Sequence, residues 1–195
     1  MALTVMQLLP TLNVGGVERG TLEIAAALVE QNHRAIVVSG GGRLVEELES
    51  VGATHIEIPI GRKSLRTLSC IGALRKTLVR ENVDIMHARS RLPAWVGSRA
   101  LARLPKDRRV RWITTVHGPY TINAYSKIMT SGEQVIAVSE FIRDYITRNY
   151  PNVPTSKIRV IPRGIDPNRY NQKFTPKDEW LATWTSQYPN LANQR

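Results

Sequence analysis

The sequence predicts an α/β fold, a doubly wound parallel sheet of about seven strands with helices on both faces. Short runs rich in Val and Ile alternate with helix-length amphipathic segments, and the links between them are mostly short. The 195 residues suffice for one full domain, and 42% hydrophobic with 22% charged residues is the balance of a globular protein. The apolar opening is too short for a membrane span or a signal peptide, so we expect a cytoplasmic protein.

Apolar runs without polar alternation identify the strands, because a strand buried on both faces of a parallel sheet needs no polar side. The expected strands are 5–9, 35–39, 55–58, 84–87, 110–116, 134–138 and 158–161. The amphipathic segments between them are the expected helices, at 17–30, 44–50, 64–81, 93–104, 122–130 and 140–148. This order is Rossmann-like, so a ligand is expected at the carboxyl ends of the strands.

A turn-rich stretch, PRGIDP, follows the last expected strand and marks a domain boundary. We therefore expect a Rossmann-like domain over 1–165, and a linker with the start of a further domain over 166–195. In the latter segment, Asp178–Gln187 is an expected helix with Trp180 and Trp184 one turn apart. A frayed tail is the alternative interpretation.

The loop after the first strand contains the paired glycines Gly15 and Gly16 in the run LNVGGVERG. Glycines let the backbone approach a phosphate or sugar, and the following helix N-terminus adds partial positive charge. The spacing fits neither the dinucleotide fingerprint nor the P-loop, whose lysine position holds Thr21. Glu18 either caps the helix or accepts a ligand hydroxyl. A tight turn without a ligand remains the alternative for the glycines.

The ends of three later strands carry further candidates. The HARSR run places Arg89 and Arg91 where a carboxylate or phosphate could bind, whereas His87 is as readily a core histidine. In TTVHGPY, His117 stands at the tip of a central strand, and the glycine and proline after it expose it to a substrate. A histidine that only fixes the turn is the alternative. Ser139 is a candidate helix N-cap.

Charge limits the partners but not the chemistry. With 27 Lys plus Arg against 16 Asp plus Glu, the net charge is +11, and basic residues concentrate in 62–80 and 99–111. A solvated surface and an anionic membrane surface are both compatible with them. Nucleic acid is disfavoured, because no stacking aromatics or known binding motif accompany the charges. One cysteine and four scattered histidines give no spacing suited to a disulfide or a zinc ion.

Five motifs in order resemble the amino-terminal half of a family 4 glycosyltransferase. They are the Gly-Gly loop with Glu-Arg, HARSR, TTVHG, VIAVS and VIPRGID, and they span nearly all of residues 4–171. The resemblance implies the GT-B architecture, in which two Rossmann-like domains face each other across a cleft. It further implies transfer of a sugar from a nucleotide sugar, with retention of anomeric configuration, to a glycan or lipid-linked acceptor. Lipopolysaccharide or another bacterial surface polysaccharide is the product class that it suggests.

The resemblance also assigns residues. His117 matches the family histidine that contacts the transferring sugar at the reaction centre, while Gly15 and Gly16 would lie against the donor diphosphate and acceptor. Further donor or acceptor contacts are expected at Glu18, Arg89, Arg91, Gly118, Tyr120 and Ser139. Neither a metal ion nor another cofactor is expected, because nothing resembles the Asp-x-Asp pair that holds a divalent ion on a diphosphate.

Activity is expected only from a longer protein. The second domain of such an enzyme supplies most charges that stabilise the leaving diphosphate, and residues 1–195 lack its motifs, so we expect no turnover from them alone. The alternative function is a stand-alone module that binds an anionic ligand or a membrane surface without catalysis. In either case the inner face of the cytoplasmic membrane is a compatible location.

Overall fold

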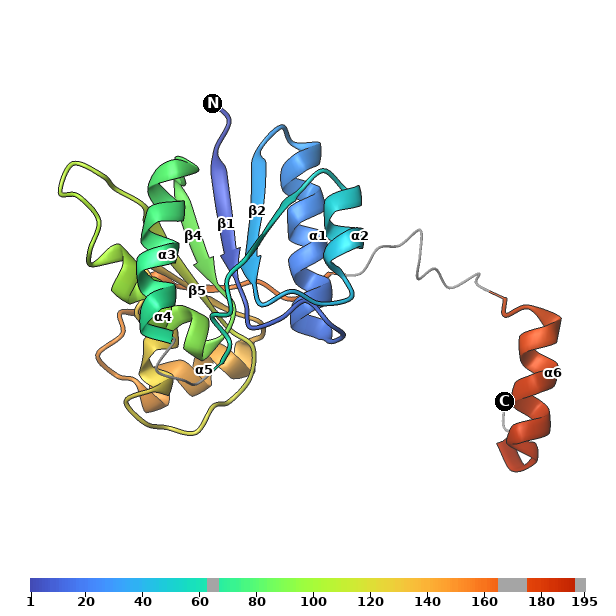
Figure 1. The fold of residues 1–195 in the computed structure, drawn as a ribbon. Helices are drawn as coiled ribbons and strands as arrows, with labels where there is room; N and C mark the ends of the chain where they lie inside the picture. The colour runs from blue at the N-terminus through green and yellow to red at the C-terminus, as the bar shows by residue number, and fades with distance from the viewer. Residues whose placement is uncertain (63–66, 165–174, 192–195) are drawn as a thin grey trace. The chain divides into compact units, whose positions relative to one another are not determined.

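The computed structural model describes residues 1–62, 67–164 and 175–191 (Figure 1). The chain divides into two compact units, Met1–Pro162 and Arg163–Arg195. The boundary expected at 165 and the first three residues of the helix expected at 64–81 lie outside the described residues.

The first unit is built around a parallel sheet of seven strands in the order β3-β2-β1-β4-β5-β6-β7. All seven lie where the sequence predicted strands, and every pairing between them is parallel. The strands are β1 (Thr4–Leu8), β2 (Arg34–Ser39), β3 (Thr54–Glu57), β4 (Ile85–Ala88), β5 (Arg111–Val116), β6 (Gln134–Ala137) and β7 (Ile158–Val160). Because the chain winds outward to β3 and then crosses back to β4, the topological switch point lies between β1 and β4.

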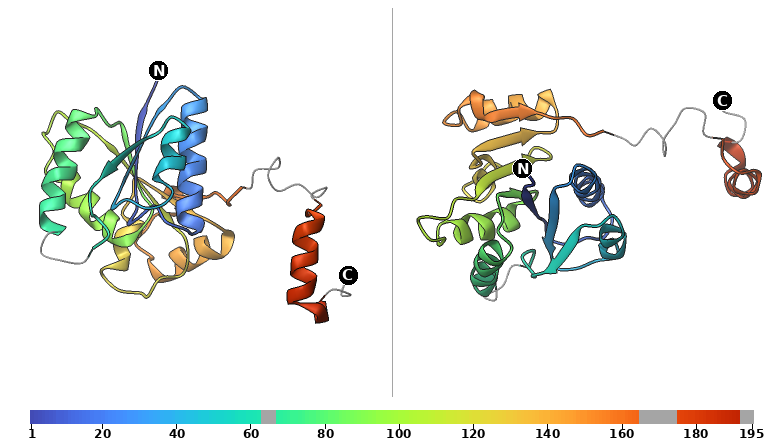
Figure 2. Two further views of the ribbon diagram at one scale, coloured as in Figure 1. Left: turned by 45° about the vertical axis from the view of Figure 1, so that its right-hand side comes forward. Right: turned by 90° about the horizontal axis from the view of Figure 1, so that it is seen from above.

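Helices cover the two faces of this sheet in two groups (Figure 2). They are α1 (Gly16–Glu30), α2 (Val45–Ser50), α3 (Thr67–Arg80), α4 (Arg91–Leu101) and α5 (Glu140–Asn149). Apolar residues of α1 and α2 pack with one face of β1 and β2, whereas those of α3, α4 and α5 form the larger core on the other face. The predicted doubly wound α/β fold is therefore confirmed.

In strand β1, side chains alternate between the two faces of the sheet, and one of them is polar. Met6 and Leu8 are fully buried in the α3–α5 core, so the residue between them, Gln7, points to the opposite face. Gln7 is also fully buried, and it lies beside His87 in the register of β1 with β4. A buried amide therefore occupies the centre of the sheet, next to the switch point.

The helix expected at 122–130 is wrong in type and extent. Only a short 3-10 helix, η1 (Ser126–Thr130), forms there. Tertiary contacts hold the preceding segment in a non-helical path, because the Tyr145 hydroxyl donates to the Tyr120 carbonyl. The Asn123 side chain then accepts from the Ser126 N–H at 2.8 Å, so that η1 begins at that point.

In the second unit, the expected helix is α6 (Asp178–Gln187). Trp180 and Trp184 stack on each other with ring centroids 6.2 Å apart, and Tyr188 lies 6.1 Å beyond Trp184. Trp180 remains 56% exposed, so this aromatic stripe lies largely in solvent within its own unit.

Candidate functional site

A pocket of about 410 Å³ opens at the carboxyl ends of β1, β4 and β5. Its lining comes from the three loops that follow these strands and from the first turn of α1. The lining residues are Pro10, Val17, Glu18, Arg89, Ser90, His117, Gly118, Pro119 and Tyr120. The pocket thus lies at the switch point, where a doubly wound sheet offers a ligand both strand tips and a helix N-terminus.

The residues predicted for the site fall into two groups. Glu18, Arg89, His117, Gly118 and Tyr120 line the pocket together. Gly15, Gly16, Arg91 and Ser139 are not among the lining residues.

Gly15 makes room for one wall of the pocket. Gly15 precedes the first residue of α1, and a Cβ built on it would lie 2.5 Å from Glu18 Oε2. The missing side chain therefore makes room for the Glu18 carboxylate to fold over the helix N-terminus. A carboxylate there interacts favourably with the helix dipole. Glu18 therefore stabilises the N-terminus of α1, and it also lines the pocket.

Ser139 is the N-cap residue of α5, as the sequence predicted. Its side chain accepts a hydrogen bond from the Ile142 N–H at 3.3 Å, at the start of α5. This contact satisfies one of the free donors of the helix N-terminus.

His87 is a core histidine. It is 6% exposed, and its Nε2 lies 2.6 Å from the Thr115 hydroxyl on β5. Burial, with smaller contributions from the nearby charges of Arg89 and His117, lowers the pKa of His87 to about 3. The ring is therefore neutral at physiological pH.

Two hydrogen bonds to Tyr120, one to its hydroxyl and one to its backbone carbonyl, hold the loop that carries His117. The backbone N–H of His117 donates to the Tyr120 hydroxyl at 3.4 Å, and the Tyr145 hydroxyl donates to the Tyr120 carbonyl. Burial raises the pKa of Tyr120 above its usual value, so its hydroxyl stays protonated.

Arg91, at the start of α4, supports the same loop. Its guanidinium carbon lies 5.0 Å from the centroid of the Tyr120 ring and 5.4 Å from that of Tyr125. Its Nη1 also donates to the Ser126 hydroxyl at 3.3 Å. Arg91 thus joins α4 to the loop through stacking and charge, a role that the sequence analysis did not assign to it.

We expect Arg91→Ala to loosen this loop. Loss of the two ring contacts and one hydrogen bond should lower the free energy of unfolding by about 1.5–3 kcal/mol, because contacts of this kind contribute about 0.5–1 kcal/mol each. Urea titration followed by circular dichroism measures the change. Arg91→Lys keeps the charge but loses the planar fork, so it should recover only part of the loss. Equal stability of Arg91→Ala and the unchanged protein would contradict the role.

The comparisons with known proteins agree with this geometry. The sequence model described as Glycosyltransferase Family 4 matches residues 14–169, which include every lining residue of the pocket except Pro10. The chain belongs to glycosyltransferase family 4. The matched range contains the five motifs of the sequence analysis, and the predicted family is thus confirmed. No curated protein matches the chain.

Solved structures show the same fold for this family 4 domain. A glycosyltransferase from Rickettsia africae ESF-5 has 35% identity and a TM-score of 0.78, over 98% of this chain and 51% of that one. Anabaena Alr3699/HepE, in complex with UDP and glucose, has 17% identity and a TM-score of 0.71 over the same shares. The apo lipopolysaccharide outer core galactosyltransferase WaaB has 10% identity and a TM-score of 0.63, over 84% of this chain and 46% of that one. The chain thus spans about half the length of each, and it has the Rossmann-like fold of one half of a GT-B glycosyltransferase.

No helix within 1–62, 67–164 and 175–191 is both long and apolar enough to cross a membrane. In the same ranges, no group of three or more His, Cys, Asp or Glu side chains is placed to hold a metal ion.

Proposed function

We propose that this chain is the acceptor-binding half of a retaining glycosyltransferase. The enzyme would transfer a sugar from a nucleotide sugar to a glycan or lipid-linked acceptor, in the synthesis of bacterial lipopolysaccharide or another surface polysaccharide. The observation that carries the proposal is the pocket, where Glu18, Arg89 and His117 meet at the N-terminus of α1. The UDP and glucose bound to Alr3699/HepE and the lipopolysaccharide activity in the name of WaaB support the substrate classes.

In this proposal, each part of the pocket has a role. His117 contacts the transferring sugar, and Gly118 and Tyr120 hold its loop beside the ligand. Gly15 and Gly16 allow the N-terminus of α1 to approach the donor diphosphate, with Glu18 available to accept a hydroxyl. Arg89 provides a positive charge.

Two predicted contacts would act indirectly, Arg91 through the His117 loop and Ser139 through the start of α5. The reaction would need no metal ion or other cofactor, so chelation by EDTA should not lower the rate.

The intact protein provides the test. Incubation with a panel of nucleotide sugars and glycan acceptors should release a nucleoside diphosphate from one donor, which a coupled assay detects. Proton NMR of the product should show the same anomeric configuration as the donor. A product of opposite configuration would contradict the retaining mechanism, and no release from any donor would contradict transferase function.

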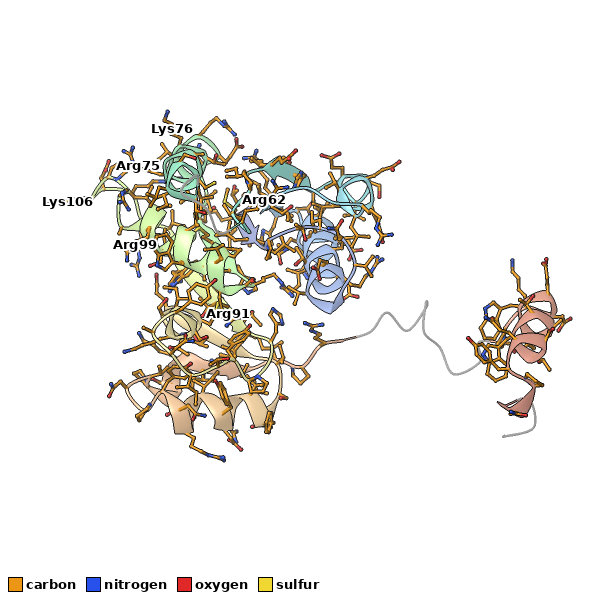
Figure 3. The ribbon with its side chains drawn as sticks, turned by 60° about the horizontal axis from the view of Figure 1, so that its bottom comes forward. Arg62, Arg75, Lys76, Arg91, Arg99 and Lys106 are labelled. Atoms are coloured by element: carbon orange, nitrogen blue, oxygen red, sulfur yellow. The ribbon has the colours of Figure 1, made fainter. Side chains whose placement is uncertain are left out.

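A second observation favours attachment to a membrane surface. The adjacent helices α3 and α4 contain no Asp or Glu. Figure 3 shows Arg75 and Lys76 on α3, Arg99 on α4 and Lys106 on the loop that follows α4, all on the same side of the molecule. Members of both basic clusters of the sequence therefore share one surface, made by Arg75, Lys76, Arg99 and Lys106, which we call the α3–α4 face. We propose that this face holds the enzyme at the anionic inner surface of the cytoplasmic membrane, since each basic residue near such a surface contributes about 1 kcal/mol.

We expect the double variant Lys76→Glu and Lys106→Glu to lose binding to vesicles that contain anionic phospholipid. Two charge reversals at about 1 kcal/mol or more per charge should weaken partitioning by about 30-fold or more in a sedimentation assay. Arg148→Glu with Lys157→Glu makes the same change in net charge on elements other than α3 and α4, namely α5 and the following 3-10 helix Thr155–Lys157. Equal loss in both double variants would contradict a specific α3–α4 face.

A further inference from the structure

The arginine of the pocket lies in a slot that the sequence analysis did not include. Arg89 is 5% exposed, and its Nη1 donates a hydrogen bond to Oε1 of Gln7 at 3.2 Å. Gln7 comes from β1 and is fully buried. The guanidinium is thus held from the centre of the sheet rather than from the surface.

The Gln7 amide has one orientation that satisfies its neighbours. Its Nε2 donates to the Thr21 carbonyl of α1 at 3.0 Å, while its Oε1 accepts from Arg89. A carbonyl only accepts and a guanidinium only donates, so exchange of the amide O and N would lose both bonds. Gln7 therefore couples the position of the guanidinium to helix α1.

Helix α1 forms the other wall of the slot at Gly20. A Cβ built on Gly20 would lie 3.1 Å from Arg89 Nη2, closer than such contacts normally allow. Glycine costs stability in a helix interior, and here it makes space for the guanidinium. Gln7 and Gly20 thus restrict Arg89 from two different elements.

We propose that Gln7 and Gly20 are positioning residues that hold Arg89 for a phosphate-bearing ligand and thereby set the anion preference of the pocket. The assignment rests on the proposed function for the origin of the phosphate, which is either the nucleoside diphosphate of the donor or the phosphate of a lipid-linked acceptor. A preformed guanidinium at a helix N-terminus binds either group by charge-assisted hydrogen bonds. Because Gln7 is neutral, it does not repel a negatively charged phosphate as a carboxylate at this position would.

Titration of the 195-residue chain with inorganic pyrophosphate tests the slot directly. In the unchanged protein, NMR signals of Val17, Gly118 and the Arg89 side chain should shift together. Gln7→Glu places a negative charge next to the guanidinium and should weaken pyrophosphate binding by about tenfold or more. Gln31→Glu, the same change at the far end of α1, should alter binding by less than about twofold.

Gly20→Ala separates positioning from folding. Alanine is the better helix former, so the variant should keep or raise the melting temperature while its Cβ displaces the guanidinium. We expect its pyrophosphate binding to weaken several-fold, and this variant decides the test if Gln7→Glu does not fold. Unchanged affinity in Gly20→Ala, or no shifts of the pocket signals in the unchanged protein, would overturn the proposal.

Two further probes separate the sources of the phosphate. UDP binding tighter than pyrophosphate, and weakened by Gln7→Glu, would assign the slot to the donor. The same result with farnesyl diphosphate would assign it to a lipid-linked acceptor. If pyrophosphate binds in this Gln7-dependent way but the intact protein transfers no sugar, the proposed function fails and the anion slot stands.

Discussion

Replacement of His117 by alanine in the intact protein is expected to lower kcat by about 10²-fold or more while KM changes little. A side chain that contacts the transferring sugar acts most strongly in the transition state, and loss of such an interaction typically costs about 10²–10³ in rate. His117 lies in the pocket wall on a loop that Tyr120 fastens, so its position before substrate binds is already defined. Steady-state kinetics with the donor found in the panel measure the effect.

Matched variants decide whether this effect is chemical or structural. His117→Asn keeps a hydrogen-bonding group and should retain more activity than His117→Ala. His33 lies just before the amino end of β2, whereas the pocket lies at the carboxyl ends of the strands. Its Nδ1 accepts a hydrogen bond from the Leu3 N–H, and His33→Gln should leave kcat unchanged. A near-normal rate for His117→Ala would remove His117 from the reaction centre.

Acidification is expected to destabilise the domain through His87. The pKa of this ring is about 3 in the folded state against 6.5 for an ordinary histidine, so the unfolded chain binds a proton more readily. Stability from the neutral ring is therefore fully present above pH 6.5 and falls as pH decreases toward 3. Each pH unit in this window contributes about 1.4 kcal/mol, so between pH 6.5 and 4.5 the loss should be about 3 kcal/mol.

Two variants isolate this contribution from that of other groups. His87→Gln cannot titrate, so its free energy of unfolding, measured by urea titration, should depend less steeply on pH than that of the unchanged protein. Thr115→Val removes the hydrogen-bond partner at 2.6 Å but keeps the titrating ring, and it should therefore keep the steep dependence. Parallel pH profiles for His87→Gln and the unchanged protein would contradict the account.

The local hydrophobic pattern of the sequence was sufficient to predict strands that are buried on both faces of the sheet. The central strands β1 and β2 follow from continuous apolar runs, which are typical of parallel strands covered on both faces. The meeting of Glu18, Arg89 and His117 followed from the rule that strand tips converge at a switch point. The short 3-10 helix at Ser126–Thr130 did not follow, because long-range contacts of Tyr120 override the local helical pattern there.

The supporting residues of the site were harder to find than its lining. Gln7 is one polar residue in an apolar run, and its partners on α1 and after β4 are distant in sequence. A signal was nevertheless present, because Gln7, His87 and Thr115 are polar residues within buried strands. In the same way, HARSR gave no means to tell that Arg89 turns into the pocket and Arg91 toward two tyrosines.

The most direct measurement is a crystal structure of the intact protein with its donor nucleotide sugar and acceptor. We expect the transferring sugar to lie within hydrogen-bond distance of His117 and a phosphate group to contact Arg89 or the N-terminus of α1. Ligands bound with no contact to the pocket of Glu18, Arg89 and His117 would contradict it.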